Sequence, residues 1–229
     1  MALSPPVIKF SIEVTTRKLI LASASPRRNE LLRLFGIPFS TKPANINEDK
    51  CDLETPRQYV IRMAYAKGHS QYAQKDEIIL SADTIVDLNG EVLGKPVDDA
   101  DARRILRLMR AKTHQVHTAL SLHFGENGEI HRDVCLSHVT MRNYSDEQID
   151  EYISRGTYHD KAGGYAIQDD RFSPVAHIEG CYTNVMGLPL CKVYCLLTEA
   201  GLSVDAKISE LCQRYNHFSF ENYLSLLNE

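Results

Sequence analysis

The chain has 229 residues, of which 43% are hydrophobic and 24% are charged, a composition typical of a globular protein with a sizeable buried core. Its 30 acidic and 26 basic residues give a formal net charge of -4, so there is no basic excess of the kind that marks nucleic-acid-binding proteins. No run of about 18 apolar residues, no secretory leader and no C-x-x-C pair among the six cysteines is present, so we expect a reduced, cytoplasmic protein without a membrane span.

The first sixteen residues carry little pattern. Residues 7–14 alternate loosely and could add an edge strand, but Pro5-Pro6 favours an extended start. We treat residues 1–17 as an N-terminal extension.

The first clear element is a strand that runs into a helix. Residues 19–22 are apolar, and Ser25 followed by Pro26 is a helix N-terminus, because serine caps the first turn and proline fits the first helical position. Gly36 ends the helix. Arg27 and Arg28 lie in its first turn, where free N–H groups and guanidinium groups favour phosphate; for an Arg-Arg pair alone, a solvated surface helix is the alternative.

Next we expect a strand over residues 37–41, a polar loop over residues 45–49 and a helix from Pro56 to about residue 74, opened by the capping box of Thr55 and Gln58. Lys67 falls on the apolar stripe of this helix. It must therefore either meet an anion or extend its ammonium group to solvent.

Residues 78–86 form the clearest buried strand, interrupted by Asp83. A carboxylate there belongs either to a structural network or to a reactive site. Asn89-Gly90 predicts a hairpin turn, which returns Lys95 toward this strand. The sequence around Lys95 lacks the upstream glycine and the following Ser or Thr of a Walker A loop.

The following elements are a helix capped by Asp98, a long hairpin of residues 113–124 and 129–142, and a helix that begins with the capping box of Ser145 and ends near Arg155. The hairpin carries four histidines. We interpret them as polar positions of a half-solvated sheet rather than as a metal site: His114, His117, His131 and His138.

Residues 156–187 are rich in glycine and lack periodicity, which in a compact domain indicates a functional loop or a surface turn. Gln168 in this stretch can read a base edge or remain solvated. An apolar helix follows over residues 188–197. Residues 201–229 are expected to form a helical tail packed on the domain, with amphipathic residues 204–215 and an apolar segment over residues 218–227.

Four cations and two carboxylates are attached to the ends of neighbouring core elements. Such a set suits metal-assisted attack of water on a polyphosphate, since the cations offset phosphate charge and a carboxylate activates water. The residues are Arg27, Arg28, Lys67, Lys95, Asp83 and Glu48.

Five motifs occur in an order that resembles the Maf family of nucleoside triphosphate pyrophosphatases, over about residues 18–197. They are Ser23-x-Ser25-Pro26-Arg27-Arg28, Ala82-Asp83-Thr84-Ile85-Val86, Gly94-Lys95-Pro96, Lys161-Ala162-Gly163 with Tyr165-x-Ile167-Gln168, and Ile178-Glu179-Gly180 with Asn184-Val185-x-Gly187-Leu188-Pro189.

The resemblance implies a single α/β domain over residues 18–200, with a long, mixed, curved sheet flanked by helices, similar to inosine triphosphate pyrophosphatases. It implies hydrolysis of a nucleoside triphosphate to the monophosphate and pyrophosphate by a homodimer. By position, Asp83 corresponds to the proton acceptor, Lys67 and Lys95 to catalytic phosphate contacts, Arg28 and Ser23 to substrate-binding residues, and Glu48 with Asp83 to ligands of a divalent metal, Mg²⁺ or Mn²⁺.

Arg27, Thr84 and Gln168 match the substrate-specificity positions of the dTTP/UTP branch, so the resemblance implies a canonical or modified pyrimidine triphosphate. The 7-methyl-GTP branch usually has tryptophan at position 27 and Asp-Gln at positions 83 and 84. Two alternatives remain open: a pyrophosphatase for 7-methyl-GTP or another noncanonical nucleotide, and a catalytically silent nucleotide-binding regulator of cell division.

Overall fold

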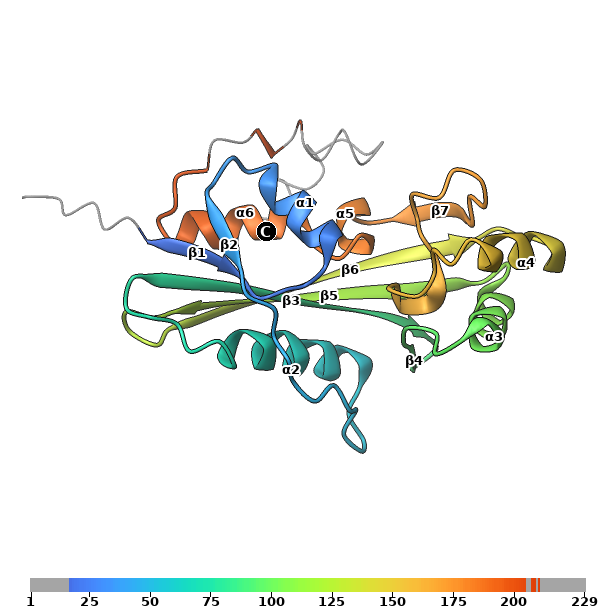
Figure 1. Cartoon of the computed structure of the whole chain (residues 1–229), viewed down its shortest axis with the longest axis horizontal. Helices are drawn as coiled ribbons and strands as arrows, with labels where there is room; N and C mark the ends of the chain where they lie inside the picture. The colour runs from blue at the N-terminus through green and yellow to red at the C-terminus, as the bar shows by residue number, and fades with distance from the viewer. Residues whose placement is uncertain (1–16, 205–206, 209, 211–229) are drawn as a thin grey trace, which may run out of the picture.

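One seven-stranded mixed sheet runs the length of the molecule, with helices on both faces (Figure 1). The computed structural model describes residues 17–204, 207–208 and 210. The strand order is β2-β1-β3-β5-β6-β7, with β4 paired to β3. The strands are β1 Lys18–Leu21, β2 Phe39–Thr41, β3 Glu77–Leu88, β4 Glu91–Leu93, β5 Thr113–Phe124, β6 Ile130–Met141 and β7 Val175–Glu179. The expected α/β class with a mixed sheet is confirmed.

The helices begin at the predicted caps. The Oγ atom of Ser25 and the Oδ1 atom of Asp98 each accept a hydrogen bond from an N–H group in the first turn of their helix. Thr55 and Ser145 form complete capping boxes with Gln58 and Gln148. The helices are α1 Pro26–Arg33, α2 Pro56–His69, α3 Asp99–Met109, α4 Asp146–Ser154, the 3₁₀ helix η1 Ala162–Gly164, α5 Tyr182–Val185 and α6 Leu190–Glu199.

One predicted helix boundary and one predicted loop need correction. Helix α2 ends at His69 rather than near residue 74, because Tyr72 adopts a positive φ of 49° and the chain turns into β3. The glycine-rich stretch also contains β7 and α5, which we did not predict. The possible strand over residues 7–14 and most of the tail, including residues 211–215 and 218–227, lie outside the described residues.

Alternating side chains of β3 pack on opposite faces of the sheet. Ile85 packs with Val60 and Ala64 of α2, and Ser81 donates a hydrogen bond to the carbonyl of Ala64 at 2.7 Å. Leu80 and its neighbours on the same face, Ile78 and Ala82, instead join the larger core beneath α1 and α6. In Figure 1, α2 covers one face of the sheet while α1, α5 and α6 cover the other.

Two of the four histidines of the long hairpin differ from our expectation of a half-solvated sheet, whereas His131 and His138 are partly exposed as expected. His114 and His117 are only 2% and 5% exposed, and His114 bonds the Tyr165 hydroxyl at 2.9 Å. Burial lowers the pKa of His114 to about 4, so it is neutral near pH 7. Within the described part of the chain, no three His, Cys, Asp or Glu side chains are grouped to hold a metal ion.

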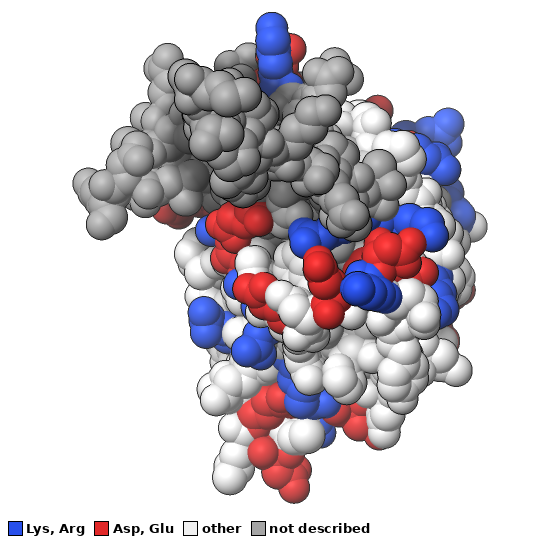
Figure 2. All heavy atoms as spheres, turned by 90° about the vertical axis from the view of Figure 1, so that its left-hand side faces the viewer, with Lys and Arg blue, Asp and Glu red and all other residues white. Residues whose placement is uncertain are grey.

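Acidic and basic side chains are interspersed over the face shown in Figure 2, which fits the absence of a basic excess in the sequence. Of the helices that the structure describes, none has the length and apolar character needed to cross a membrane.

The edge of β3 is interrupted where the candidate site lies. Strand β1 pairs with β3 as far as Leu80, and β4 pairs with it only from Val86 onward. On the opposite side, β5 pairs with β3 continuously from Ile78 to Asp87. Within the described ranges, residues 81–85 therefore have no strand partner on the β1 side, and this gap leaves room for a ligand.

Candidate active site

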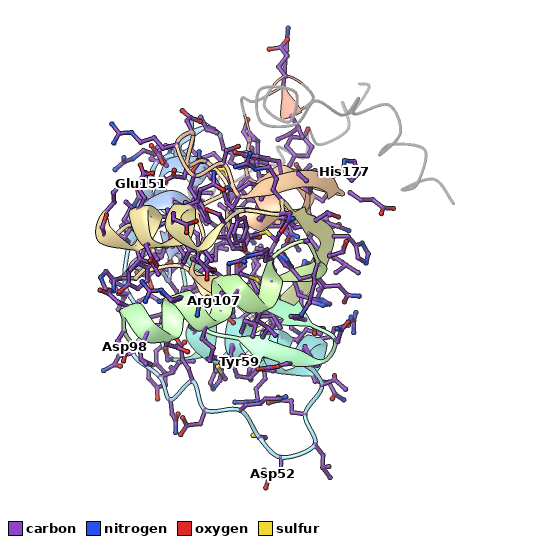
Figure 3. All side chains as sticks on the ribbon, turned by 90° about the vertical axis from the view of Figure 1, so that its right-hand side faces the viewer. Asp52, Tyr59, Asp98, Arg107, Glu151 and His177 are labelled. Carbon is purple, nitrogen blue, oxygen red and sulfur yellow. The ribbon has the colours of Figure 1, made fainter. Side chains whose placement is uncertain are left out.

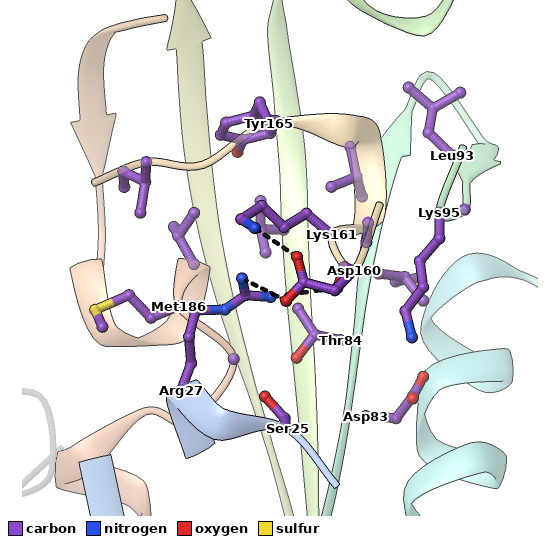
Figure 4. A pocket seen from close by; sticks show the side chains of 18 of the residues that line it. Ser25, Arg27, Asp83, Thr84, Leu93, Lys95, Asp160, Lys161, Tyr165 and Met186 are labelled. Carbon is purple, nitrogen blue, oxygen red and sulfur yellow. Dashed lines mark hydrogen bonds and ion pairs between the residues drawn. The ribbon is translucent and has the colours of Figure 1, made fainter. Parts of the chain in front are cut away.

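A cavity of about 550 Å³ lies at the gap between β1 and β4, within the size range of sites for drug-sized ligands (Figure 4). Its walls come from α1, α2, β3, the β4 return and the loop around η1. The cavity brings together eight of the nine residues singled out from the sequence: Arg27, Arg28, Glu48, Lys67, Asp83, Thr84, Lys95 and Gln168.

On the α2 side of β3, Lys67 bridges two carboxylates. Its Nζ lies 2.6 Å from Oδ1 of Asp83 and 2.8 Å from Oε1 of Glu48. The side chains of Lys67 and Asp83 are only 12% and 10% exposed, whereas that of Glu48 is 54% exposed. Of the two alternatives for Lys67, the structure therefore selects the anion partner. We call these three residues the charged end of the cavity.

The environment of Asp83 favours proton uptake. Burial raises the pKa of this carboxyl group above its ordinary value, although the charges of Lys67 and Arg28 oppose the effect. A carboxylate with a raised pKa is a stronger base, and its position in the cavity makes it accessible to a bound water.

The loop that carries Glu48 is fastened to α2. Tyr59 donates its hydroxyl proton to the carbonyl of Glu48 at 2.7 Å. Arg62 donates to both carboxylate oxygens of Glu54 at 2.7 Å and to the carbonyl of Asp49 at 2.9 Å. Figure 3 shows the tip of this loop, at Asp52, extending away from the body, whereas Tyr59 of α2 lies against it. These contacts hold Glu48 opposite Lys67.

The charged end suits a divalent cation that arrives with its substrate. Mg²⁺ usually binds through one or two carboxylates, several waters and phosphate oxygens, rather than in a complete cage of protein ligands. Glu48 and Asp83 provide two carboxylates, and the exposed Glu48 leaves access for water and phosphate. The donor set therefore fits Mg²⁺ or Mn²⁺, although it falls short of a site built from protein ligands alone.

On the opposite face of β3, Arg28 is held by neutral partners. Its Nη2 donates to the Thr84 hydroxyl at 3.0 Å, and its Nε donates to the carbonyl of Gly187 at 2.9 Å. Gly187 has a φ of +105°, and a Cβ atom there would lie 3.3 Å from Oγ1 of Thr84, so this close approach favours glycine. The Thr84 hydroxyl in turn lies 2.9 Å from that of Thr118. We call Arg28, Thr84 and Thr118 the hydroxyl end.

Ser23, which we expected to line the pocket, does not. Its side chain is buried behind Arg28, where Oγ accepts hydrogen bonds from the Ser25 backbone at 3.1 Å and from Arg28 Nη1 at 3.5 Å. It can support the turn and the arginine, but it does not face the cavity.

Asp160 lies between two cations at the cavity wall (Figure 4). Its Oδ2 lies 3.3 Å from Nη1 of Arg27, and its Oδ1 pairs with Nζ of Lys161. Lys161 also donates to the carbonyl of Thr157. In the free protein, one carboxylate therefore occupies cations that a phosphate could otherwise contact.

Lys95 and Gln168 remain available to a ligand. Both are exposed in the cavity wall, and no hydrogen bond or ion pair joins either side chain to another residue of the described chain. The loop around Gln168 reaches the β4 return through a hydrogen bond from Gly163 N to Gly94 O at 2.9 Å. Gly163 has a φ of +71°, and a Cβ atom there would lie 3.0 Å from Val86, so glycine permits this contact.

With this geometry in place, the comparison with known proteins is direct. Residues 18–200 match the Maf-like protein family. The chain belongs to this family. It is 43% identical over 185 residues to a dTTP/UTP pyrophosphatase of Koribacter versatilis (strain Ellin345), covering 80% of this chain and 95% of that protein. It is 41% identical over 182 residues to a dTTP/UTP pyrophosphatase of Pyrococcus furiosus, covering 79% and 94%.

Among solved structures, a HAM1 protein from Coxiella burnetii aligns with this Maf-like chain over 80% of its length and 99% of the other chain. The TM-score is 0.46 and the sequence identity is 14%.

Three residues of this Maf-like site were not singled out from the sequence: Asp160, Tyr59 and Thr118. Asp160 directly precedes the Lys161-Ala162-Gly163 motif, which was a usable signal. Tyr59 and Thr118 had no local signal, because each acts through a residue that the fold brings to it.

Proposed function

We propose that the chain hydrolyses dTTP and UTP to the monophosphate and pyrophosphate, with Asp83 as the general base and a divalent metal as cofactor. The observation that carries the proposal is the contact of a buried, cavity-lining Asp83 with Lys67, beside a second carboxylate and several cations. The names of relatives about 40% identical over four fifths of the chain support the same activity.

In the proposed reaction, a water oxygen bonds to the α-phosphorus while the bond to the α–β bridging oxygen breaks, and pyrophosphate leaves. Asp83 takes the proton of the attacking water on a carboxylate oxygen. Lys67 orients this carboxylate, and Lys95, Arg27 and Lys161 are placed to contact phosphate oxygens.

Glu48 and Asp83 would hold Mg²⁺ or Mn²⁺, which when bound would offset the charge of the triphosphate. The chain's own contribution is to keep Glu48 near Lys67 through the contacts of Tyr59 and Arg62 with its loop.

Arg27, Thr84 and Gln168 line the same cavity as the charged end. We assign these three residues to recognition of a pyrimidine nucleotide. An amide such as Gln168 can donate to and accept from a base edge at the same time. Modified pyrimidine triphosphates with an unaltered recognition edge are equally suited substrates.

The test is pyrophosphate release across canonical and modified triphosphates, including dTTP, UTP and 7-methyl-GTP, with Mg²⁺ or Mn²⁺. We expect the highest kcat/KM for dTTP and UTP, with monophosphate and pyrophosphate as products. Preference for 7-methyl-GTP would contradict the proposed substrate. A folded protein that binds nucleotides but releases no pyrophosphate would instead support the silent regulator.

A further inference from the structure

A chain of hydrogen bonds runs from Arg28 through two threonines to a backbone carbonyl. Arg28 Nη2 lies 3.0 Å from Oγ1 of Thr84, which lies 2.9 Å from Oγ1 of Thr118, and that oxygen lies 3.0 Å from the carbonyl oxygen of Asn184. Thr84 and Thr118 face each other directly in the β3–β5 register. Thr118 is fully buried and is not part of the cavity wall.

The two ends of this chain fix the direction of every hydrogen bond in it. A guanidinium can only donate and a carbonyl can only accept. Thr118 therefore gives its single proton to Asn184, and the proton between the two hydroxyls must come from Thr84. Thr84 thus accepts from Arg28 and donates to Thr118.

This leaves Thr84 with one unused lone pair and no proton for a ligand, because a hydroxyl has one donor and two acceptor positions. Thr84 is partly exposed and lines the cavity, so a bound molecule can reach the hydroxyl. Toward that molecule the group acts as an acceptor.

We infer that Thr118 is a positioning residue that takes up the Thr84 proton, so that the site favours a pyrimidine with an N–H donor at N3 over one without it. The inference rests on the proposed function and specifies how its substrate class is read. Uracil and thymine carry a proton at N3, whereas N3 of cytosine carries a lone pair. An acceptor-only hydroxyl therefore complements the first two bases and repels the third.

The position of Thr118 allows this role to be separated from folding. Asn184 is held independently, because its Nδ2 donates to the carbonyl of Val116 and to the Ser137 hydroxyl, both at 2.9 Å. Its carbonyl also accepts from Gly187 N at 2.9 Å. Removal of the Thr118 hydroxyl therefore leaves α5 anchored and the Asn184 carbonyl paired.

The experiment compares kcat/KM for UTP and CTP in the wild type, Thr118→Val and Thr118→Ser. In Thr118→Val the Thr84 proton is released toward the cavity, and we expect the UTP:CTP ratio to fall about tenfold through loss of base discrimination. Thr118→Ser keeps the hydroxyl and should restore the wild-type ratio. A purely structural loosening of Arg28 would slow both substrates alike, so an unchanged ratio in Thr118→Val would overturn the inference.

Thr140→Val is the matched control. Thr140 forms another cross-strand hydroxyl pair, with Thr113 at 2.8 Å between β6 and β5, away from the cavity. Its loss should leave the UTP:CTP ratio unchanged. If thermal unfolding shows that Thr118→Val does not fold, Thr118→Ala is measured in its place, with the same expected fall.

Calorimetric binding of UMP and CMP to the same proteins separates this inference from the proposed function. A wild type that binds UMP better than CMP without hydrolysing UTP would refute the enzyme, while loss of that preference in Thr118→Val would still support the inference. Equal binding of UMP and CMP by the wild type would overturn the inference even if UTP is hydrolysed.

Discussion

The two ends of the cavity are built on consecutive residues of one strand, yet they differ in chemistry. Asp83 faces α2 and lies 2.6 Å from the Lys67 ammonium group, which in turn lies 2.8 Å from the carboxylate of Glu48. Thr84 faces the opposite side of the sheet and joins a chain of hydrogen bonds that begins at the Arg28 guanidinium and passes through two hydroxyls to a backbone carbonyl. Because successive side chains of a strand alternate between faces, β3 separates the proposed reactive groups from those proposed to recognise the base.

The difference teaches which property each end requires. At the charged end, ionisation states and Coulombic interactions dominate, so changes there should act mainly on rate and pH dependence. At the hydroxyl end, direction of hydrogen bonds dominates, so changes there should act mainly on the choice of substrate.

Loss of the proposed base should have the largest effect. Asp83→Asn keeps the size of the side chain but cannot accept the water proton, and we expect kcat for UTP to fall about 10³-fold, within the usual range for general bases. Calorimetry should show that nucleotide binding is retained. Full turnover by this variant would remove Asp83 from the mechanism.

Removal of the ammonium group should move the pH profile. Lys67 opposes the effect of burial on Asp83, so Lys67→Met should raise the pKa of Asp83 further. Since the base must be deprotonated, activity is lost as the pH falls through this pKa, and the acidic limb of kcat/KM should shift to higher pH. A limb that stays in place would show that another group controls it. Arg57→Met, which removes an exposed cation of α2 that does not line the cavity, is a control for nonspecific charge loss.

Loss of a base-reading amide should change selectivity more than rate. We expect Gln168→Ala to lower the preference for UTP over GTP about tenfold while kcat for UTP changes less. Gln74→Ala is the matched control, because Gln74 is exposed and does not line the cavity. Gln148 is also outside the cavity, but its side chain caps α4, so its loss would affect folding. Equal losses for every triphosphate would contradict a role in base selection.

The smallest effect should come from the cavity wall. Asp160 neutralises Arg27 and Lys161, so Asp160→Asn should free both cations and lower KM for UTP about threefold at low salt, as expected for partly exposed ion pairs. The gain should shrink as salt screens the charges. Asp150→Asn, which removes a similar exposed ion pair between Asp150 of α4 and Arg103 of α3, should leave KM unchanged. A raised KM in Asp160→Asn would indicate that Asp160 positions the loop instead.

The sequence predicted features determined by neighbours in the chain. The caps at Ser25, Thr55 and Ser145 depend on hydrogen bonds three residues apart, and each is present. Most of the candidate site was also predictable, because cations and carboxylates follow recognisable strand and helix ends.

Features that depend on distant pairing were not predictable. Thr84 and Thr118 are 34 residues apart, and only the β3–β5 register makes them neighbours. Ser23 belongs to the same motif as Arg28, but its side chain is buried and bonds to Arg28 instead of lining the cavity. Strand β7 lacks strict alternation and is partly exposed, so its pairing with β6 left little trace in the local pattern.

The uninterrupted register of β3 against β5 restricts how this protein can evolve. Ten consecutive residue pairs, from Ile78–Phe124 to Asp87–Gln115, contain no bulge. Deleting one residue of β3 before Asp83 would move Asp83 into the place of Ala82, opposite Leu120, and Thr84 into the place of Asp83, so each side chain would move to the other face of the sheet. New substrate preferences in this lineage should therefore arise by substitution within β3, while insertions and deletions accumulate in the surrounding loops.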